Sequence, residues 1–279
     1  MSGSVDLASN TAAQWRRIAA VTRKELITFA SYRVSMIMSM FEIWYFAISF
    51  YFIDRFVGDV DLLSDLEGGY FEFVLIGSIV TSFSRIGISA FSSLVSEEQS
   101  DGTLEILLAS PTPMSTLLVG SFIVPFIFLA VETTVLVVVG LGFFGSGIPV
   151  VGLITSLPVL LLTTLSFVPV GVLGASFIMV AKRGDPFAAL ANRLAILLSG
   201  ALYPVAVLPD WMQLLGKFIP ATYAVQAVRE LTQQNASFVD VIDEVLIVTL
   251  FVVVALPLSL MVFRRSINLA RRAGVLGTY

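Results

Sequence analysis

The chain has 279 residues, of which 57% are hydrophobic and 13% are charged, and its formal net charge is −4. A soluble globular domain is nearer half apolar and a quarter charged, so this composition predicts a protein whose exterior largely faces lipid. Cysteine and histidine are both absent from the sequence. Their absence excludes disulfides, thiol catalysis and metal or acid–base sites built on either residue, and the acidic balance argues against nucleic-acid binding.

The N-terminal segment 12–33 alternates apolar and basic residues at roughly helical spacing. Apolar residues such as Trp15, Ile18 and Phe29 alternate with basic ones such as Arg16 and Lys24. This pattern predicts an amphipathic helix that lies along the cytoplasmic interface of the membrane, where it anchors and orients the chain; a mobile gating role is the alternative. We expect no signal peptide, because no short apolar core with a cleavage site begins the sequence.

Six apolar segments follow. A bilayer core of about 30 Å needs roughly 20 apolar residues in helical form. The sequence therefore predicts an all-α integral membrane protein with one transmembrane domain, residues 1–279, and six spans at 34–53, 70–95, 116–144, 150–181, 187–208 and 241–263. Strands of a membrane barrel would be short and alternating, and no such pattern occurs.

Basic residues gather before the first predicted span, between the fourth and fifth, and after the sixth. Cytoplasmic loops carry the excess of Lys and Arg, so both termini, including a tail at 264–279, are predicted to lie on the cytoplasmic side of the plasma membrane. The loop 96–114 disagrees, because it holds four acidic residues and no basic one. Acidic residues count little in this rule, so the predicted orientation stands.

Among the ionisable residues inside predicted spans, three are candidates for a functional or structural role at membrane depth: Glu42, Arg85 and Glu132. Counted at 1.5 Å per residue, Glu42 and Arg85 have similar depths on neighbouring spans, which predicts an ion pair between them. Glu132 has no obvious cationic partner in the sequence. These residues are candidates either for a polar path through the membrane or for a structural pair that holds two helices together.

The chain contains no Walker A pattern, no dinucleotide-binding glycine pattern after a strand, and no soluble segment large enough for a nucleotide-binding domain. No nucleophile–base motif indicates a membrane enzyme either. We therefore expect a protein without catalytic activity of its own. If it uses ATP, another chain supplies the ATPase.

The loop at 96–113 holds a short amphipathic segment that two prolines end. Asp101 is placed to cap a helix, and Leu104, Leu107 and Leu108 fall on one of its faces. Such an apolar ridge fits a groove in a cytoplasmic partner, or else rests on the membrane surface.

The same loop follows the pattern E-x-x-x-G-T-L-E-x-L-L-x-S-P, in the residues Glu98, Gly102, Thr103, Leu104, Glu105, Leu107, Leu108, Ser110 and Pro111. This pattern resembles the coupling loop of ABC transporter permeases of the ABC-2 type. The resemblance implies a cytoplasmic coupling helix that docks onto a nucleotide-binding subunit and transmits ATP-driven movement.

A second stretch, 203–231, carries prolines and aromatic residues between the last two predicted spans. Its prolines prevent one straight helix, and its Trp and Tyr suit a membrane interface. The stretch is similar to a signature of the same family, in the residues Tyr203, Pro204, Pro209, Trp211, Pro220, Tyr223 and Arg229. In that family it forms short re-entrant helices on the outer side of the membrane.

The resemblance covers essentially the whole chain and implies the membrane subunit of an ATP-driven exporter. It implies two permease copies, expected to be a homodimer with the substrate path at their interface, and two ATPase subunits that bind ATP and Mg. The permease itself is expected to bind no cofactor or metal. The alternative is an ion-coupled secondary carrier or channel that acts without an ATPase, with Glu42, Arg85 and Glu132 as its ion-coupled groups.

Overall fold

The computed structural model describes residues 22–23, 33–57, 68–104, 106, 114–181, 186–234 and 236–272. Every regular element within these ranges is a helix, which confirms the all-α prediction for them. The elements are α2 (Arg33–Val57), α4 (Gly69–Ser100), α6 (Met114–Gly142), α7 (Val150–Thr155), α8 (Leu157–Ala181), α9 (Pro186–Leu198), the 3₁₀ turn η1 (Val205–Val207), α10 (Asp210–Gly216), α11 (Pro220–Gln233) and α12 (Ile242–Arg272).

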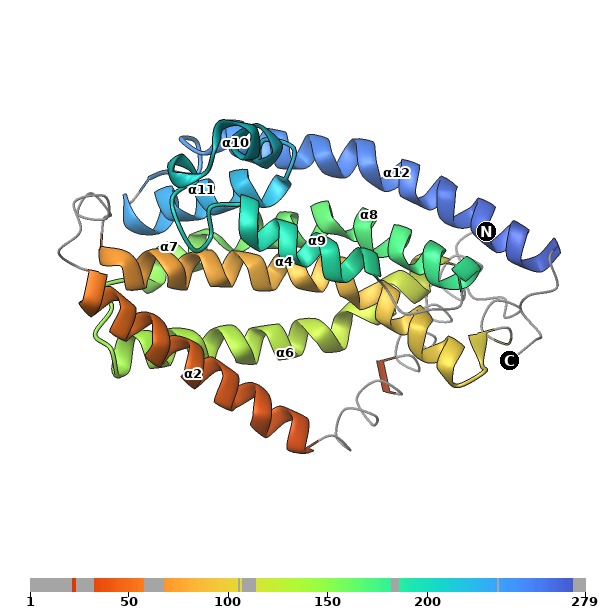
Figure 1. The fold of residues 1–279 in the computed structure, drawn as a ribbon, viewed down its shortest axis with the longest axis horizontal. Coiled ribbons are helices and arrows are strands. Elements are labelled where there is room, and N and C mark those ends of the chain that lie inside the picture. The colour runs from red at the N-terminus through yellow and green to blue at the C-terminus, as the bar shows by residue number, and fades with distance from the viewer. Residues whose placement is uncertain are drawn as a thin grey trace, which may run out of the picture.

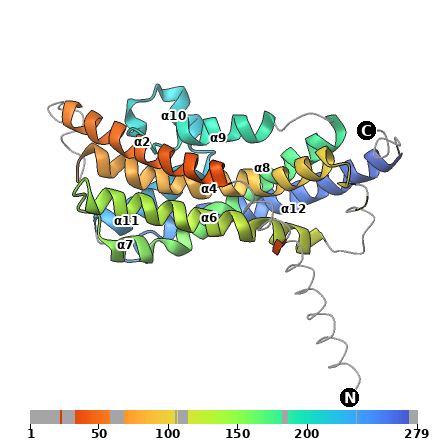
Figure 2. The same ribbon diagram turned by 90° about the horizontal axis from the view of Figure 1, so that it is seen from below.

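The long helices run side by side along the long axis of the molecule, and their connections gather at its two ends (Figure 1). One end, called here the Trp211 end, carries α7, α10, α11 and the loop 143–149. The opposite end, called here the Asp101 end, carries the turn after α4 and the C-terminal end of α12. The view in Figure 2 places α7, α10 and α11 at the same end of the bundle.

Four helices are long and apolar enough to cross a membrane, namely α4, α6, α8 and α12. The 25 residues of α2 rise roughly 37 Å at 1.5 Å per residue, so its length also suits a crossing. The 13 residues of α9 rise only about 20 Å, which is too short. The prediction of one continuous fifth span over 187–208 is therefore wrong, because the helix ends at Leu198 and the chain turns at Gly200 with φ 74°.

The predicted fourth span consists of two helices, α7 and α8, separated at Ser156. Pro158 lacks the N–H that a continuous helix would bond to the carbonyl of Ile154, and it disfavours the helical conformation in the residue before it. The buried Ser156 hydroxyl donates to the carbonyl oxygen of Gly152 at 2.7 Å. This break lets α7 turn away from α8 and pack against α11.

The helix α4 is the central element, in contact with α2, α6, α8, α9 and α11. In its most apolar stretch 72% of the residues are buried, compared with 11% in α12. The outer face of α12 carries a row of exposed apolar side chains that includes Leu246, Leu250, Val253, Val254 and Leu258. Such a face is suited to lipid, whereas the surroundings of α4 are protein.

Small residues bring α4 and α8 close together. A Cβ atom on Gly87 of α4 would lie 2.3 Å from the carbonyl oxygen of Thr164 on α8, and one on Gly171 of α8 would lie 2.6 Å from the carbonyl oxygen of Ile88. The Thr164 hydroxyl donates to the carbonyl oxygen of Phe83 at 3.0 Å. Close backbone approach and interhelical hydrogen bonds of this kind hold helices together in lipid, where the hydrophobic effect does not.

Two carboxylates connect helix ends at the Trp211 end. Asp54, near the end of α2, accepts a hydrogen bond from the backbone N–H of Phe71 in the first turn of α4 at 3.1 Å. Glu72 of α4 accepts one from the backbone N–H of Gly147, in the loop after α6. These bonds satisfy backbone donors that the helix start and the loop would otherwise leave free.

The predicted interfacial helix at 12–33 lies outside the described residues, apart from positions 22, 23 and 33. The predicted tail at 264–279 is described only as far as Arg272, and up to that residue it continues α12.

The α4–α8 contact yields a stability prediction. We expect Gly87→Ala to lower the free energy of unfolding by about 1–3 kcal/mol, because the new methyl group meets backbone that cannot move aside easily. Gly142→Ala, at the end of α6 with open space around it, is the matched control and should change stability little. Thermal unfolding of both variants in the same detergent measures the difference, and equal midpoints would contradict the packing described.

Candidate functional site

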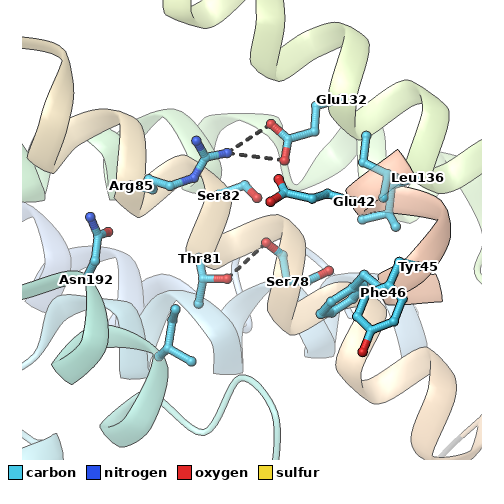
Figure 3. A pocket seen from close by; sticks show the side chains of 12 residues that line it. Glu42, Tyr45, Phe46, Ser78, Thr81, Ser82, Arg85, Glu132, Leu136 and Asn192 are labelled. Atoms are coloured by element: carbon cyan, nitrogen blue, oxygen red, sulfur yellow. Dashed lines mark hydrogen bonds and ion pairs between the residues drawn. The ribbon is translucent and has the colours of Figure 1, made fainter. Parts of the chain in front are cut away.

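An open cavity of about 580 Å³ lies among α2, α4, α6 and α9 (Figure 3). Its polar lining consists of Glu42, Ser78, Thr81, Ser82, Arg85, Glu132 and Asn192, and its apolar lining of Ile43, Tyr45, Phe46, Leu136 and Ile196. The three candidate residues Glu42, Arg85 and Glu132 therefore meet in one cavity.

Arg85 pairs with Glu132 rather than with Glu42. The Arg85 guanidinium lies 2.9 Å and 3.2 Å from the two carboxylate oxygens of Glu132, and the two side chains are 46% and 35% exposed. The predicted Arg85–Glu42 pair is thus wrong, because counting residues gives the depth of a side chain but not the face of the helix on which it lies. Glu42 points into the same cavity (Figure 3) and has no hydrogen-bond or ion-pair partner in the described part of the chain.

The accessible face of α4 is polar along much of its length. Ser78, Ser82, Arg85, Ser89 and Ser93 follow one another at spacings of three or four residues, which places them on one face of the helix. None of the five is fully buried, although most of α4 is. A face that met lipid would be apolar, so this one is suited to water or to another protein surface.

A second cavity, of about 260 Å³, lies between α4 and α6 toward the Asp101 end. Ser89, Ser93 and Ser121 line it together with Arg85 and Glu132, which also line the first cavity. The Arg85–Glu132 ion pair consequently stands at the boundary between the two cavities. The sequence prediction named the charged residues but missed the serines, although their helical spacing was visible in the sequence.

The turn after α4 is closed by three residues of the predicted coupling loop. Gly102 has a φ of 69°, a conformation that favours glycine, and directs the chain back toward α4. The N–H of Thr103 donates to the Glu98 carbonyl oxygen at 2.9 Å, and the Thr103 hydroxyl donates to the Glu98 carboxylate at 2.5 Å. Asp101 stands at the C-cap position of α4, and most of the helix that it was predicted to cap lies outside the described residues.

Leu104 and Ile106 differ sharply in exposure. Leu104 is 1% exposed and packs among residues such as Phe91, Leu94 and Phe263, so it anchors the loop to the bundle and does not belong to a partner-facing ridge. Ile106 is 72% exposed. The remaining predicted coupling residues, namely Glu105, Leu107, Leu108, Ser110 and Pro111, lie outside the described residues.

The predicted re-entrant stretch 203–231 forms η1, α10 and α11 at the Trp211 end. Its three prolines each mark the start of one helix: Pro204 and Pro209 directly precede η1 and α10, and Pro220 is the first residue of α11. Proline suits these positions because its fixed φ matches a helix start and its missing N–H would be unpaired there. Trp211 on α10 is 64% exposed, as an interfacial aromatic residue would be.

The end of α9 exposes carbonyl oxygens, and side chains from the following stretch bind them. The Tyr203 hydroxyl donates to the carbonyl oxygen of Leu197 at 2.5 Å. The Thr222 hydroxyl lies 2.8 Å from the carbonyl oxygen of Gly216 and 3.5 Å from that of Leu198. Burial raises the pKa of Tyr203 above the ordinary tyrosine value. Tyr223 plays a similar part nearby, where its hydroxyl donates to the carbonyl oxygen of Lys217 at 3.1 Å.

Arg229 on α11 connects three elements. Its guanidinium donates to the carbonyl oxygens of Phe73 on α4 at 3.1 Å and of Ala201, beyond α9, at 3.2 Å, and it lies 3.4 Å from the centre of the Phe73 ring. Gly77 of α4 makes this approach possible, since a Cβ there would lie 2.0 Å from the Ala201 oxygen. Burial lowers the pKa of Arg229 to about 9, which leaves it charged at neutral pH.

The described residues contain no group of three or more acidic side chains that could hold a metal ion. The first cavity has two acidic side chains in its lining, Glu42 and Glu132, and Glu132 is already bound to Arg85.

Comparison with known proteins adds three findings. The sequence model of a family described as "ABC-2 type transporter" matches residues 14–232. The chain is similar to the "Probable multidrug ABC transporter permease YbhR" of Escherichia coli (strain K12), with 27% identity over 172 residues that cover 60% of this chain and 45% of that protein. It is also similar to "ABC transporter G family member 20" of Dictyostelium discoideum, with 27% identity over 169 residues that cover 58% of this chain and 22% of that protein. The chain thus spans less than half the length of these relatives.

The identity of the ion pair is testable by double-mutant cycles. We expect Arg85→Gln and Glu132→Gln to be coupled in stability by on the order of 1 kcal/mol, because each single change leaves a charge unpaired within the bundle. The matched cycle with Arg85→Gln and Glu42→Gln should give a coupling near zero. Unfolding midpoints of the five variants provide both values. Stronger coupling to Glu42 would restore the pairing predicted from the sequence.

The contacts of Arg229 predict that the segment after α9 packs less tightly when the guanidinium is removed. We expect Arg229→Gln to cost about 2 kcal/mol or more, because it removes charged donors from two carbonyl oxygens. Since the natural chain has no cysteine, the buried Ser199 changed to Cys supplies a single reporter thiol. Maleimide should label this thiol faster in Arg229→Gln than in the control Arg193→Gln, an exposed arginine on α9. Equal labelling rates would show that Arg229 does not hold the broken segment.

Proposed function

The chain belongs to the ABC-2 type transporter family, and from this premise we propose that it is the permease subunit of an ABC exporter whose ATP hydrolysis occurs in a separate partner subunit. The observation that carries the proposal is the loop after α4, in which the family pattern coincides with a turn closed by Glu98, Gly102 and Thr103. The partner subunits would bind ATP and Mg, and this chain would act as a multi-pass membrane protein.

The proposed mechanism begins at that loop. The partner ATPase would dock on the exposed side of the loop, which includes Ile106. Because Leu104 is buried in the bundle and Thr103 is bonded to Glu98, the loop and the end of α4 would move together. The helix α4 contacts five other helices and lines both cavities, so displacement of its end would change the shape of the polar path. Such coupling requires an element with two arrangements, and α4 is our candidate.

We further propose that two copies assemble, as a homodimer, with their polar faces toward a shared path. The polar face of α4 and the half-exposed Arg85–Glu132 pair support this arrangement, since charges at membrane depth are stable only against protein or water. The Lys and Arg distribution supports cytoplasmic termini and hence an Asp101 end on the cytoplasmic side. The similarity to the Escherichia coli relative, a probable multidrug permease, supports an organic compound as the cargo.

A second candidate function is an ion-coupled carrier or channel that works without an ATPase. The meeting of Glu42, Arg85 and Glu132 in one cavity favours it. Ion-gradient-driven transport by the purified chain in liposomes without nucleotide would support this alternative, whereas a strict requirement for ATP and a partner would exclude it.

The coupling role yields a prediction for the loop. We expect the double substitution Glu105→Ala and Leu107→Ala to abolish stimulation of the partner's ATP hydrolysis, because it changes two residues of the family's coupling pattern while the anchor at Leu104 remains. Leu104→Ala is the contrasting variant, and it should instead lower stability by about 2–5 kcal/mol, because this side chain is buried.

The measurement is ATP hydrolysis by the reconstituted complex, with unfolding midpoints of the permease variants recorded in parallel. Undiminished stimulation in a well-folded double variant would count against the coupling role of this loop.

A further inference from the structure

The first cavity has an excess of negative charge. Its ionisable lining consists of Arg85, which is paired with Glu132, and of Glu42, which has no partner among the described residues. Two carboxylates thus face one guanidinium. An unpaired carboxylate at membrane depth costs several kcal/mol unless a cation or water accompanies it. The cavity is therefore electrostatically suited to a positively charged occupant.

The rest of the lining limits the kind of cation. Phe46, Leu136 and Ile196 supply apolar surface, and the ring faces of Phe46 and Tyr45 attract organic cations. A volume of about 580 Å³ lies within the usual range for drug-sized ligands and is far larger than a single metal ion needs. A bare metal ion would also require several oxygen ligands at fixed distances, and the described residues offer no such group.

We infer that this cavity binds a monovalent lipophilic organic cation, with Glu42 as its counter-charge. The inference rests on the proposed function and deepens it by naming a class of cargo. Glu42 lies on α2, whereas the hydroxyl groups of Ser78 and Ser82 lie on α4, so a bound cation would bridge two helices (Figure 3). Arg85 stays bound to Glu132, and that bond keeps the guanidinium from neutralising Glu42.

The test uses two probes of the same shape and opposite charge, tetraphenylphosphonium and tetraphenylborate. Each radiolabelled probe is titrated against the purified full-length chain in nanodiscs of zwitterionic lipid, without nucleotide and without an ATPase. We expect saturable binding of tetraphenylphosphonium and no comparable binding of tetraphenylborate. Equal affinity for the two probes would overturn the inference, because it would show apolar partitioning without charge selection.

Variants identify the site. Glu42→Gln, which keeps the shape of an exposed side chain, should weaken tetraphenylphosphonium binding about tenfold or more. The matched control Asp243→Asn removes one exposed carboxylate from the first turn of α12, outside the cavity, and should leave binding unchanged. Ile196→Trp should also weaken binding, because it fills the cavity without changing its charge. Unfolding midpoints measured without probe verify that each variant is folded.

The outcomes of this binding assay test the cation site alone and do not depend on whether the chain has an ATPase partner. Unchanged binding in folded Glu42→Gln would overturn the inference even if Ile196→Trp weakens binding, since the cavity would then bind without its counter-charge. Loss of binding in Glu42→Gln, with normal binding in Asp243→Asn, would support the inference. Because no ATPase is present in the assay, a failure of the chain to associate with one would contradict the proposed function and leave this result intact.

Discussion

A backbone polar group that is buried away from water needs a partner from the protein, and this requirement shapes the stretch that follows α9. The helix stops at Leu198, short of a full crossing, and so frees carbonyl oxygens. Tyr203 donates to the carbonyl oxygen of Leu197 within that last turn, and Arg229 on α11 donates to the carbonyl oxygen of Ala201, just beyond the helix. Arg229 also bonds to α4, and the broken segment is thereby fixed to the central helix of the bundle.

Charged side chains obey the same constraint. Lipid-facing surfaces on α12 are apolar, while Glu42, Arg85 and Glu132 gather in one cavity beside the polar face of α4. This arrangement places the three side chains beside α4, the helix whose end carries the family's loop pattern. In our account a movement applied at that loop reaches the cavities through one rigid element, since Thr103, Glu98 and Leu104 join the loop to α4.

The sequence was informative wherever a property depends on local composition. Apolar length predicted both bounds of α6 and the starts of α4 and α12 to within a few residues, whereas α4 and α12 continue past their predicted ends at 95 and 263 to Ser100 and Arg272. Prolines at 204, 209 and 220 predicted the breaks that they mark. Side-chain pairing depends on helix rotation and packing, so Arg85 was assigned the wrong carboxylate. The end of α9 escaped prediction for a similar reason, because apolar residues continue past Leu198 and the groups that stabilise the break come from residues up to 31 positions later along the chain. Leu104 and its neighbours share one pattern, yet only packing distinguishes the buried anchor from the exposed Ile106.

The central claim is that this chain is a membrane subunit driven by an ATPase on another chain. Affinity purification of the tagged full-length protein from its native membranes in mild detergent, followed by identification and quantification of the proteins that remain bound, tests it most directly. Our account predicts a nucleotide-binding ATPase subunit in stoichiometric amount, with ATP hydrolysis in the purified complex. A homogeneous chain that retains transport activity without any bound ATPase would contradict it.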